Sequence, residues 1–114
     1  MSDLRALGAR AEDRAADYLV GQGYTIVTRR HKTRRGEIDI VALDGDQLVF
    51  VEVKFRRAPG YRPEDSVGKG KMSALTEAAA LYVLAMEIQP ESYRFDLIDI
   101  DSAGLRHHVD LLKP

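Results

Sequence analysis

The sequence predicts one α/β domain in which helices pack against a mixed β-sheet, and three observations lead to this prediction. The chain has 114 residues, the size of one ordinary domain, and it shows no internal repeat or interdomain linker. Its fractions of 45% hydrophobic and 31% charged residues are ordinary for a globular protein. Segments with helical spacing and segments with strand alternation follow one another in the order α-β-β-β-α-β-β. A single domain is therefore expected over residues 1–114.

The amino-terminal part is expected to form a helix and a first strand. Apolar side chains recur at helical spacing over residues 3–20, and Gly21 and Gly23 supply the end of the helix. Residues 24–28 (YTIVT) are β-branched and aromatic, which favours a strand. The basic run at residues 29–35 (RRHKTRR) is then expected to be a loop that flanks this strand.

The middle of the chain carries the signal of a β-hairpin. Residues 37–43 (EIDIVAL) and 47–55 (QLVFVEVKF) alternate on either side of Asp44-Gly45-Asp46. Glycine accepts the positive φ angle that a tight turn requires, so these two segments are expected to pair.

A loop, a helix and two strands are expected after the hairpin. Residues 56–70 contain two Pro and three Gly, which indicates a loop. Residues 71–87 have helical spacing, with one apolar stripe formed by Met72, Leu75, Ala79, Tyr82 and Met86. Strands are expected at residues 93–100 and 105–112.

The polar residues of these last two strands are expected to serve the fold. Arg94 and Asp96 fall on one face of their strand, so a pair that orders the sheet is the simplest expectation. His107 and His108 are neighbours in a strand, so their side chains should point to opposite faces and should not bind one metal ion together.

Several classes of protein are excluded or disfavoured by composition. No apolar run approaches the roughly 20 residues that span a bilayer, and the amino terminus lacks the apolar centre of a signal peptide. The absence of Cys excludes disulfides, a thiolate nucleophile and Cys-ligated zinc. No phosphate-binding P-loop, dinucleotide fingerprint or serine-nucleophile motif is present. A cytoplasmic protein without a membrane partner is therefore expected.

Charge is distributed unevenly along a chain whose net charge is only -1. Residues 29–35 hold five Arg or Lys and one His without an acid, and six basic residues between Lys54 and Lys71 face only two acids. Such asymmetry permits a basic face on a nearly neutral protein. The alternative is that each cluster is only a solvated segment beside a strand.

The hairpin is expected to bring two carboxylates together. Side chains alternate along a strand, so Glu37, Asp39 and Val41 should share one face, and Ile38, Ile40 and Ala42 the other. On the second strand Glu52 and Lys54 share a face, which places Glu52 near Asp39. Two close carboxylates repel unless a proton or a cation lies between them, and hard oxygen ligands suit Mg²⁺ or Mn²⁺. The alternative is ordinary charge alternation on a half-exposed strand.

The two halves of this hairpin also carry a resemblance. Gly36-Glu37-Ile38-Asp39-Ile40-Val41-Ala42 and Leu48-Val49-Phe50-Val51-Glu52-Val53-Lys54 resemble the signature of the YraN family of small bacterial endonuclease-like proteins. That family is similar to the PD-(D/E)xK nuclease superfamily, which includes archaeal Holliday-junction resolvases. The likeness runs from the Gly8/Glu12 helix through Arg94-Phe95-Asp96. It implies a restriction-endonuclease-like αβββαβ core with a central mixed sheet flanked by helices.

The resemblance implies a role for each residue of the hairpin site. Asp39 and Glu52 would bind Mg²⁺ or Mn²⁺ together with the backbone carbonyl of Val53, and Lys54 would be the catalytic lysine. Glu12, on the first helix, matches a glutamate that completes the site in related nucleases, although a glutamate at the border of an apolar stripe can also be simply solvated. Glu37 would support the metal ligands or form a salt bridge with an arginine.

The expected partner is nucleic acid. The residues expected to contact phosphates are Arg30, Lys32, Arg34, Arg35, Arg56, Arg57 and Lys71. The resemblance favours DNA over RNA, includes branched DNA, and suggests that two copies of the chain could hold such a substrate. The sequence departs from the expected patterns in two places. Ile38-Asp39 replaces the Pro-Asp of the superfamily, and the Arg-rich run stands where the family often shows an Asn and an aromatic residue.

A metal-dependent nuclease is thus the leading hypothesis. The alternatives are a catalytically inactive nucleic-acid-binding module and an adaptor in DNA uptake or repair with the same fold.

Overall fold

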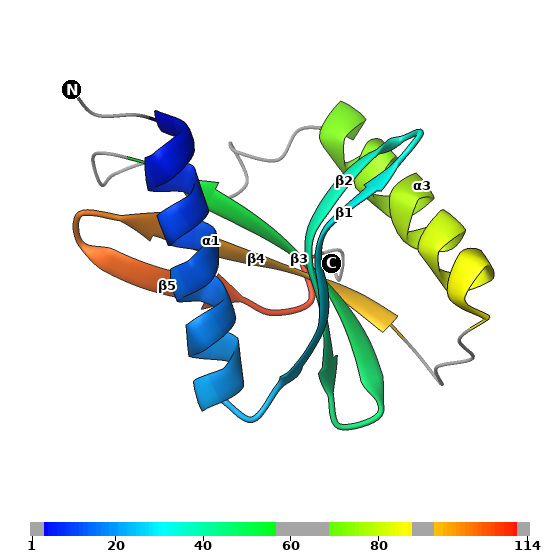
Figure 1. Ribbon diagram of the computed structural model, residues 1–114, viewed down its shortest axis with the longest axis horizontal. Helices are drawn as coiled ribbons and strands as arrows, with labels where there is room; N and C mark the ends of the chain where they lie inside the picture. Colours follow the sequence, from blue (N-terminus) through cyan, green and yellow to red (C-terminus); the bar gives the residue numbers. More distant parts are fainter. Residues whose placement is uncertain (1–3, 57–68, 88–92, 112–114) are drawn as a thin grey trace.

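The computed structural model describes residues 4–56, 69–87 and 93–111, which form two helices and one five-stranded sheet (Figure 1). The elements are α1 (Leu4–Gly21), β1 (Thr25–Thr33), β2 (Gly36–Asp44), β3 (Gln47–Phe55), α3 (Lys69–Met86), β4 (Tyr93–Asp101) and β5 (Gly104–His108). The strand order in the sheet is β1-β2-β3-β4-β5, with β3 and β4 parallel and the other neighbours antiparallel. The mixed α/β architecture expected from the sequence is therefore confirmed.

The first strand differs from its prediction because it continues through the basic run. β1 pairs with β2 as far as Thr33 and Gly36, so only Arg34 and Arg35 form the turn. The hydroxyl of Thr33 donates to the carbonyl of Gly36 (3.1 Å) and accepts from the backbone N–H of Arg35 (3.0 Å), which fixes this turn. β1 lies at the edge of the sheet, where charged side chains reach solvent without leaving the ladder. The expected loop at residues 29–35 was therefore wrong.

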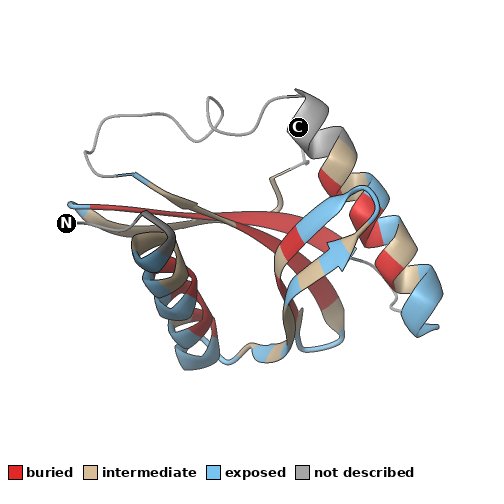
Figure 2. Ribbon diagram, turned by 45° about the horizontal axis from the view of Figure 1, so that its top comes forward, coloured by how far each residue is buried: buried red, intermediate tan, exposed pale blue. Residues whose placement is uncertain are grey.

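The two helices cover opposite faces of the sheet and produce two apolar clusters (Figure 2). The cluster under α1 consists of Ala11, Ala15, Ala16, Leu19, Ile40, Ala42, Val49, Val51, Ile98 and Ile100. The cluster under α3 consists of Ile38, Val41, Leu48, Phe50, Leu75, Ala78, Ala79, Tyr82 and Phe95. The central hairpin is thus buried on both faces.

Two further expectations about faces were wrong. Ile38 packs under α3 and Ile40 under α1, although strand alternation placed them on one face. The pairing of β1 with β2 is interrupted between these two residues, where Arg30 has a left-handed φ angle of 52°. Met86, expected in the apolar stripe of the second helix, is 52% exposed because it lies in the last turn of α3, beyond the sheet.

Tyr82 offers a direct test of the core under α3. Its ring is fully buried and packs edge-on against Phe50, but its hydroxyl has no hydrogen-bond partner among the residues described. A buried hydroxyl without a partner costs about 1–3 kcal/mol. We therefore expect Tyr82→Phe to keep or raise the free energy of unfolding, measured by urea titration. A loss of more than about 1 kcal/mol would show that the hydroxyl has a partner.

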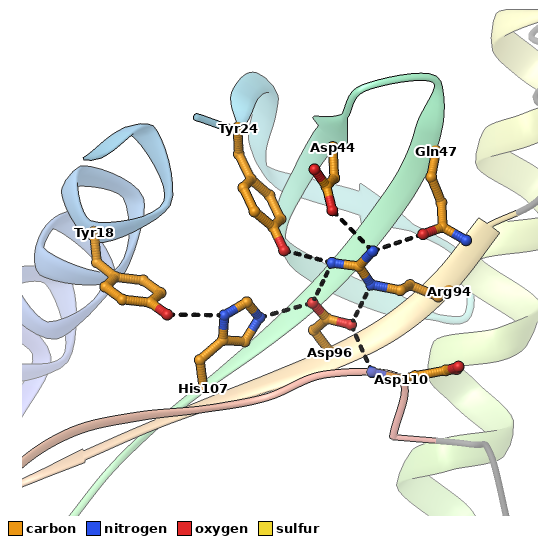
Figure 3. Close-up of polar contacts among 8 residues, drawn as sticks. All are labelled: Tyr18, Tyr24, Asp44, Gln47, Arg94, Asp96, His107 and Asp110. Carbon is orange, nitrogen blue, oxygen red and sulfur yellow. Dashed lines mark hydrogen bonds and ion pairs between the residues drawn. The ribbon is translucent and has the colours of Figure 1, made fainter. Parts of the chain in front are cut away.

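A polar network lies on the α1 side of the sheet, between β4 and its neighbours (Figure 3). Arg94 donates from Nε to Asp96 Oδ1 (2.9 Å) and also contacts Tyr24, Asp44 and Gln47. Burial acts to raise the pKa of Asp96, but the hydrogen bonds from His107 and Arg94 outweigh it and lower this pKa below its usual range. The expected Arg94–Asp96 pair is confirmed, and it lies at the centre of a larger network.

The two neighbouring histidines lie on opposite faces of β5, as expected. His107 Nε2 lies 2.7 Å from Asp96 Oδ2, while His108 Nε2 lies 2.6 Å from Asp99 Oδ2. His107 also reaches Tyr18 on α1, so this residue joins the helix to the sheet (Figure 3).

Candidate metal and phosphate site

Asp39 lies at an interruption of the β-ladder. The β1–β2 ladder pairs Arg29 with Ile40 and then His31 with Ile38, which leaves Arg30 facing Asp39. On the other side, the β2–β3 ladder ends at Ile40 and Val51. Beyond this point the side chain of Asp39 takes over: its Oδ2 accepts a hydrogen bond from the backbone N–H of Val53 at 2.8 Å. The carboxylate is thus held by backbone between two strands.

Asp39 and Glu52 act on each other electrostatically. Glu52 is 4% exposed, and Asp39 is half-buried. Burial and the negative charge of Glu52 raise the pKa of Asp39 to about 7, against the smaller opposing effect of the Val53 N–H. Near neutral pH the pair therefore holds a proton readily, and a cation placed between the two carboxylates would replace that proton.

Lys54 supplies positive charge on the same face of β3. Its Nζ lies 3.5 Å from Glu52 Oε1, and its side chain is 22% exposed. The sequence-based prediction that Asp39, Glu52 and Lys54 come together is therefore matched by their positions in the structure.

A cavity of about 320 Å³ opens beside the two carboxylates. It is lined by Gly36, Glu37, Asp39, Glu52, Ala74 and Leu75, so β2 and β3 form one wall and α3 the other. Gly36 has a φ angle of 150°, a conformation that favours glycine, and a Cβ there would meet the Cβ of Ala74 at 3.9 Å. Glu37 is exposed and lines this cavity, and its supporting role stays a prediction. Ala74 and Leu75, which also line the cavity, could not be assigned to the site from sequence alone.

The donor atoms fit Mg²⁺ or Mn²⁺ better than zinc. The carbonyl of Val53 points to the same side of β3 as its N–H, which faces Asp39, so it can join the two carboxylates. Within the described ranges, no group of three or more His, Asp or Glu side chains is placed to hold a metal ion. Two carboxylates, a backbone carbonyl and water form the kind of incomplete protein set that Mg²⁺ accepts, whereas closed zinc sites use four protein ligands.

Glu12 has different partners from those expected. It is 8% exposed, and its Oε1 accepts from Arg29 Nη2 and Arg30 Nε, each at 3.1 Å. Its negative charge still contributes to the raised pKa of Asp39, although less than burial and the charge of Glu52 do. Glu12 therefore lies near the carboxylate pair but is held by two arginines, of which Arg29 had no expected role.

The described side chains expected to contact phosphates lie on β1, in the β1–β2 turn and directly after β3. Lys32, Arg34 and Arg35 are exposed at the β1–β2 turn, and Arg56 is exposed directly after β3. Arg35 Nε pairs with Glu77 Oε2 of α3 at 3.0 Å, beside a second cavity of about 270 Å³. Arg57 and the side chain of Lys71 lie outside the described residues.

Comparison with known proteins adds a family to this geometry. A family model described as "Uncharacterised protein family UPF0102" matches residues 11–100 of the chain. The chain belongs to this family. The matched residues run from α1 to β4 and include all four predicted catalytic residues, Glu12, Asp39, Glu52 and Lys54.

Individual UPF0102 proteins cover most of the chain. The protein from Symbiobacterium thermophilum is 40% identical over 98 residues, which are 85% of this chain and 83% of its own length. The protein from Chlorobium limicola is 43% identical over 100 residues (86% and 77%), and that from Vibrio cholerae 39% identical over 112 residues (96% and 90%). The names of these relatives state no activity, so they confirm the family expected from the sequence and leave its chemistry open.

Neither helix of the described chain has the length and apolar character to cross a membrane.

Proposed function

We propose that this UPF0102 protein is a Mg²⁺- or Mn²⁺-dependent nuclease that hydrolyses phosphodiester bonds in nucleic acid, with DNA favoured. The observation that carries the proposal is the juxtaposition of Asp39 and Glu52 at the ladder break, where the pKa of Asp39 is raised to about 7. Strongly raised pKa values of paired carboxylates in a cleft are typical of functional sites, since stability alone would favour their separation.

Each residue of the site has a definable task. Asp39, Glu52 and the carbonyl of Val53 would hold the ion, which would polarise a phosphoryl oxygen and lower the pKa of a bound water. Lys54, held beside Glu52, would orient the attacking water and offset the charge that develops on the phosphate. The side chains of Lys32, Arg34 and Arg35 would bind neighbouring phosphates, because they are exposed at the turn next to the cavity-lining Gly36.

The element order α1-β1-β2-β3-α3-β4 and the parallel β3–β4 pair support a restriction-endonuclease-like fold as part of this proposal. The preference for DNA, including branched DNA bound by two copies of the chain, comes from the resemblance of the hairpin to nucleases. A cytoplasmic location belongs to the same proposal.

A cleavage assay tests the proposal. Wild type and Asp39→Ala/Glu52→Ala would be incubated with single-stranded, duplex, flapped and four-way DNA and with structured RNA, each with Mg²⁺, Mn²⁺ or EDTA. We expect wild type alone to cut at least one substrate, and EDTA to abolish cleavage. The double variant excludes a contaminating nuclease.

Two other outcomes would contradict the proposal. If both proteins bind nucleic acid equally and neither cuts it, the chain is a binding module, whose affinity should fall steeply with salt. If wild type binds neither divalent metal nor nucleic acid, an adaptor that binds another protein becomes the better description.

A further inference from the structure

Two consecutive arginines converge on one carboxylate oxygen near the proposed metal site. Arg29 Nη2 and Arg30 Nε each lie 3.1 Å from Glu12 Oε1, and Arg29 Nη2 also lies 2.6 Å from Asp13 Oδ1. Neighbouring residues of a regular strand point to opposite faces, so this convergence needs a local cause.

The cause is the backbone of Arg30. Its φ angle is 52°, in the left-handed region that non-glycine residues rarely adopt. This residue lies where β1 and β2 leave Arg30 and Asp39 out of the ladder, so the kink turns both guanidinium groups toward α1. A conformation of this kind costs about 1–3 kcal/mol and persists only where surrounding contacts enforce it.

The arginine pair is accessible, whereas Glu12, the carboxylate that both arginines share, is not. The side chain of Arg29 is 33% exposed and that of Arg30 54%, while that of Glu12 is 11% exposed. Guanidinium groups arranged around one oxygen match the geometry of a phosphate oxygen as well as that of a carboxylate. The site also lies beside Asp39, because Arg30 faces Asp39 across the ladder break and the charge of Glu12 reaches Asp39.

We infer that Arg29 and Arg30 form a phosphate-binding clamp, which Glu12 occupies in the free protein and from which a phosphodiester group of the substrate displaces it. The inference rests on the proposed function, because it assigns a backbone contact of the same nucleic-acid substrate. Glu12 is then an internal competitor of the substrate, and its release would add a carboxylate beside Asp39 only when a phosphate is in place.

Competition by Glu12 makes a specific prediction about binding. Glu12→Gln removes the negative charge that holds both guanidinium groups, while Asp13 keeps its contact with Arg29. This variant should therefore bind a fluorescein-labelled single-stranded oligonucleotide at least about 5-fold more tightly than wild type, in EDTA to prevent cleavage. The matched control is Asp17→Asn, which removes one charge from an exposed position of the same helix. Fluorescence anisotropy at fixed salt measures both affinities.

Adding Arg30→Asn to Glu12→Gln tests whether the clamp carries the gain. Asparagine accepts a positive φ angle more readily than most residues, so this change removes the guanidinium and keeps the backbone. We expect the double variant to return to wild-type affinity or below. Equal gains in Glu12→Gln and Asp17→Asn would show a general charge effect and overturn the inference, as would no gain in either.

A second measurement needs no variant. Titration of wild type with pyrophosphate should shift the Nε–Hε NMR resonances of Arg29 and Arg30 together. These shifts should occur at lower pyrophosphate concentrations than the shift of the Arg34 resonance. Resonances of the pair that stay fixed at saturation would overturn the inference even if the oligonucleotide binds. Cleavage in the assay above with no shift would leave the nuclease proposal standing and remove the clamp alone, whereas absence of all nucleic-acid binding would remove both.

Discussion

Asp39→Asn is expected to abolish cleavage and, at the same time, to make the protein more stable at pH 8. A proposed metal ligand is lost, so cleavage should fall by about 1,000-fold or more, in the range seen when one essential group is removed. The amide can still accept the hydrogen bond from the Val53 N–H, and it removes the charge that burial and Glu52 disfavour. The free energy of unfolding at pH 8 should therefore rise by about 1–3 kcal/mol.

The pH dependence gives the sign of this effect. The pKa of Asp39 is about 7 in the folded protein and near 3.8 in the unfolded chain. Between these two pH values the folded state therefore binds more protons than the unfolded state. The resulting stability is present below about pH 4 and is lost as the pH rises to about 7, by at most about 1.4 kcal/mol per pH unit. Asp39→Asn should lose this slope, which urea unfolding from pH 4 to pH 8 measures.

The control for Asp39→Asn is Asp46→Asn, at an exposed position of the β2–β3 turn. It should leave both cleavage and the pH profile unchanged. If Asp39→Asn instead destabilises the protein at pH 8, Asp39 is an ionised structural residue. The argument that the Asp39–Glu52 pair destabilises the folded state then fails. Bound Mg²⁺ should oppose the wild-type loss of stability, because the ion stabilises the charged form of the pair.

Arg94→Leu is expected to cause the largest loss of stability in the described chain. Asp96 is fully buried, and its partners are Arg94, His107 and the backbone N–H of Asp110 (Figure 3). Removal of Arg94 leaves a buried charge without its main counterion, which costs about 3–5 kcal/mol. The free energy of unfolding from urea titration at neutral pH measures this loss.

Arg35→Leu is the matched control for Arg94→Leu. Arg35 also forms an ion pair, with Glu77, but their side chains are 58% and 51% exposed. An exposed pair contributes only about 0–1 kcal/mol, so a small loss is expected. Similar losses in the two variants would show that the Arg94 network gains nothing from burial.

Much of the fold could be predicted because the local signals are strong. Asp44-Gly45-Asp46 and the alternation on either side of it specify β2 and β3, and the structure has both strands there. Alternation along these strands also placed Asp39, Glu52 and Lys54 together. A hairpin fixes its own pairing, so neighbours across it can be read from sequence.

The rest of the site depends on contacts that spacing does not contain. The left-handed φ angle of Arg30 reverses the face of one arginine, and no local rule predicts this conformation for Arg. For the same reason, the ion pairs of Glu12 with Arg29 and Arg30 could not be predicted. Ala74 and Leu75 line the cavity only because α3 packs against β2, which is a long-range contact.

The hairpin turn also sets how this protein tolerates insertions and deletions. Asp44 pairs with Gln47, and Ile40 pairs with Val51. The same register places Asp39 opposite Glu52 at the next position along the two strands. One residue added to or removed from the turn would shift β3 by one position and send Glu52 and Lys54 to the face under α1. The apolar residues of both faces would be displaced at the same time. The length of this short turn is therefore as strict a requirement for the proposed chemistry as the acids themselves, although the turn lies at the opposite end of the strands.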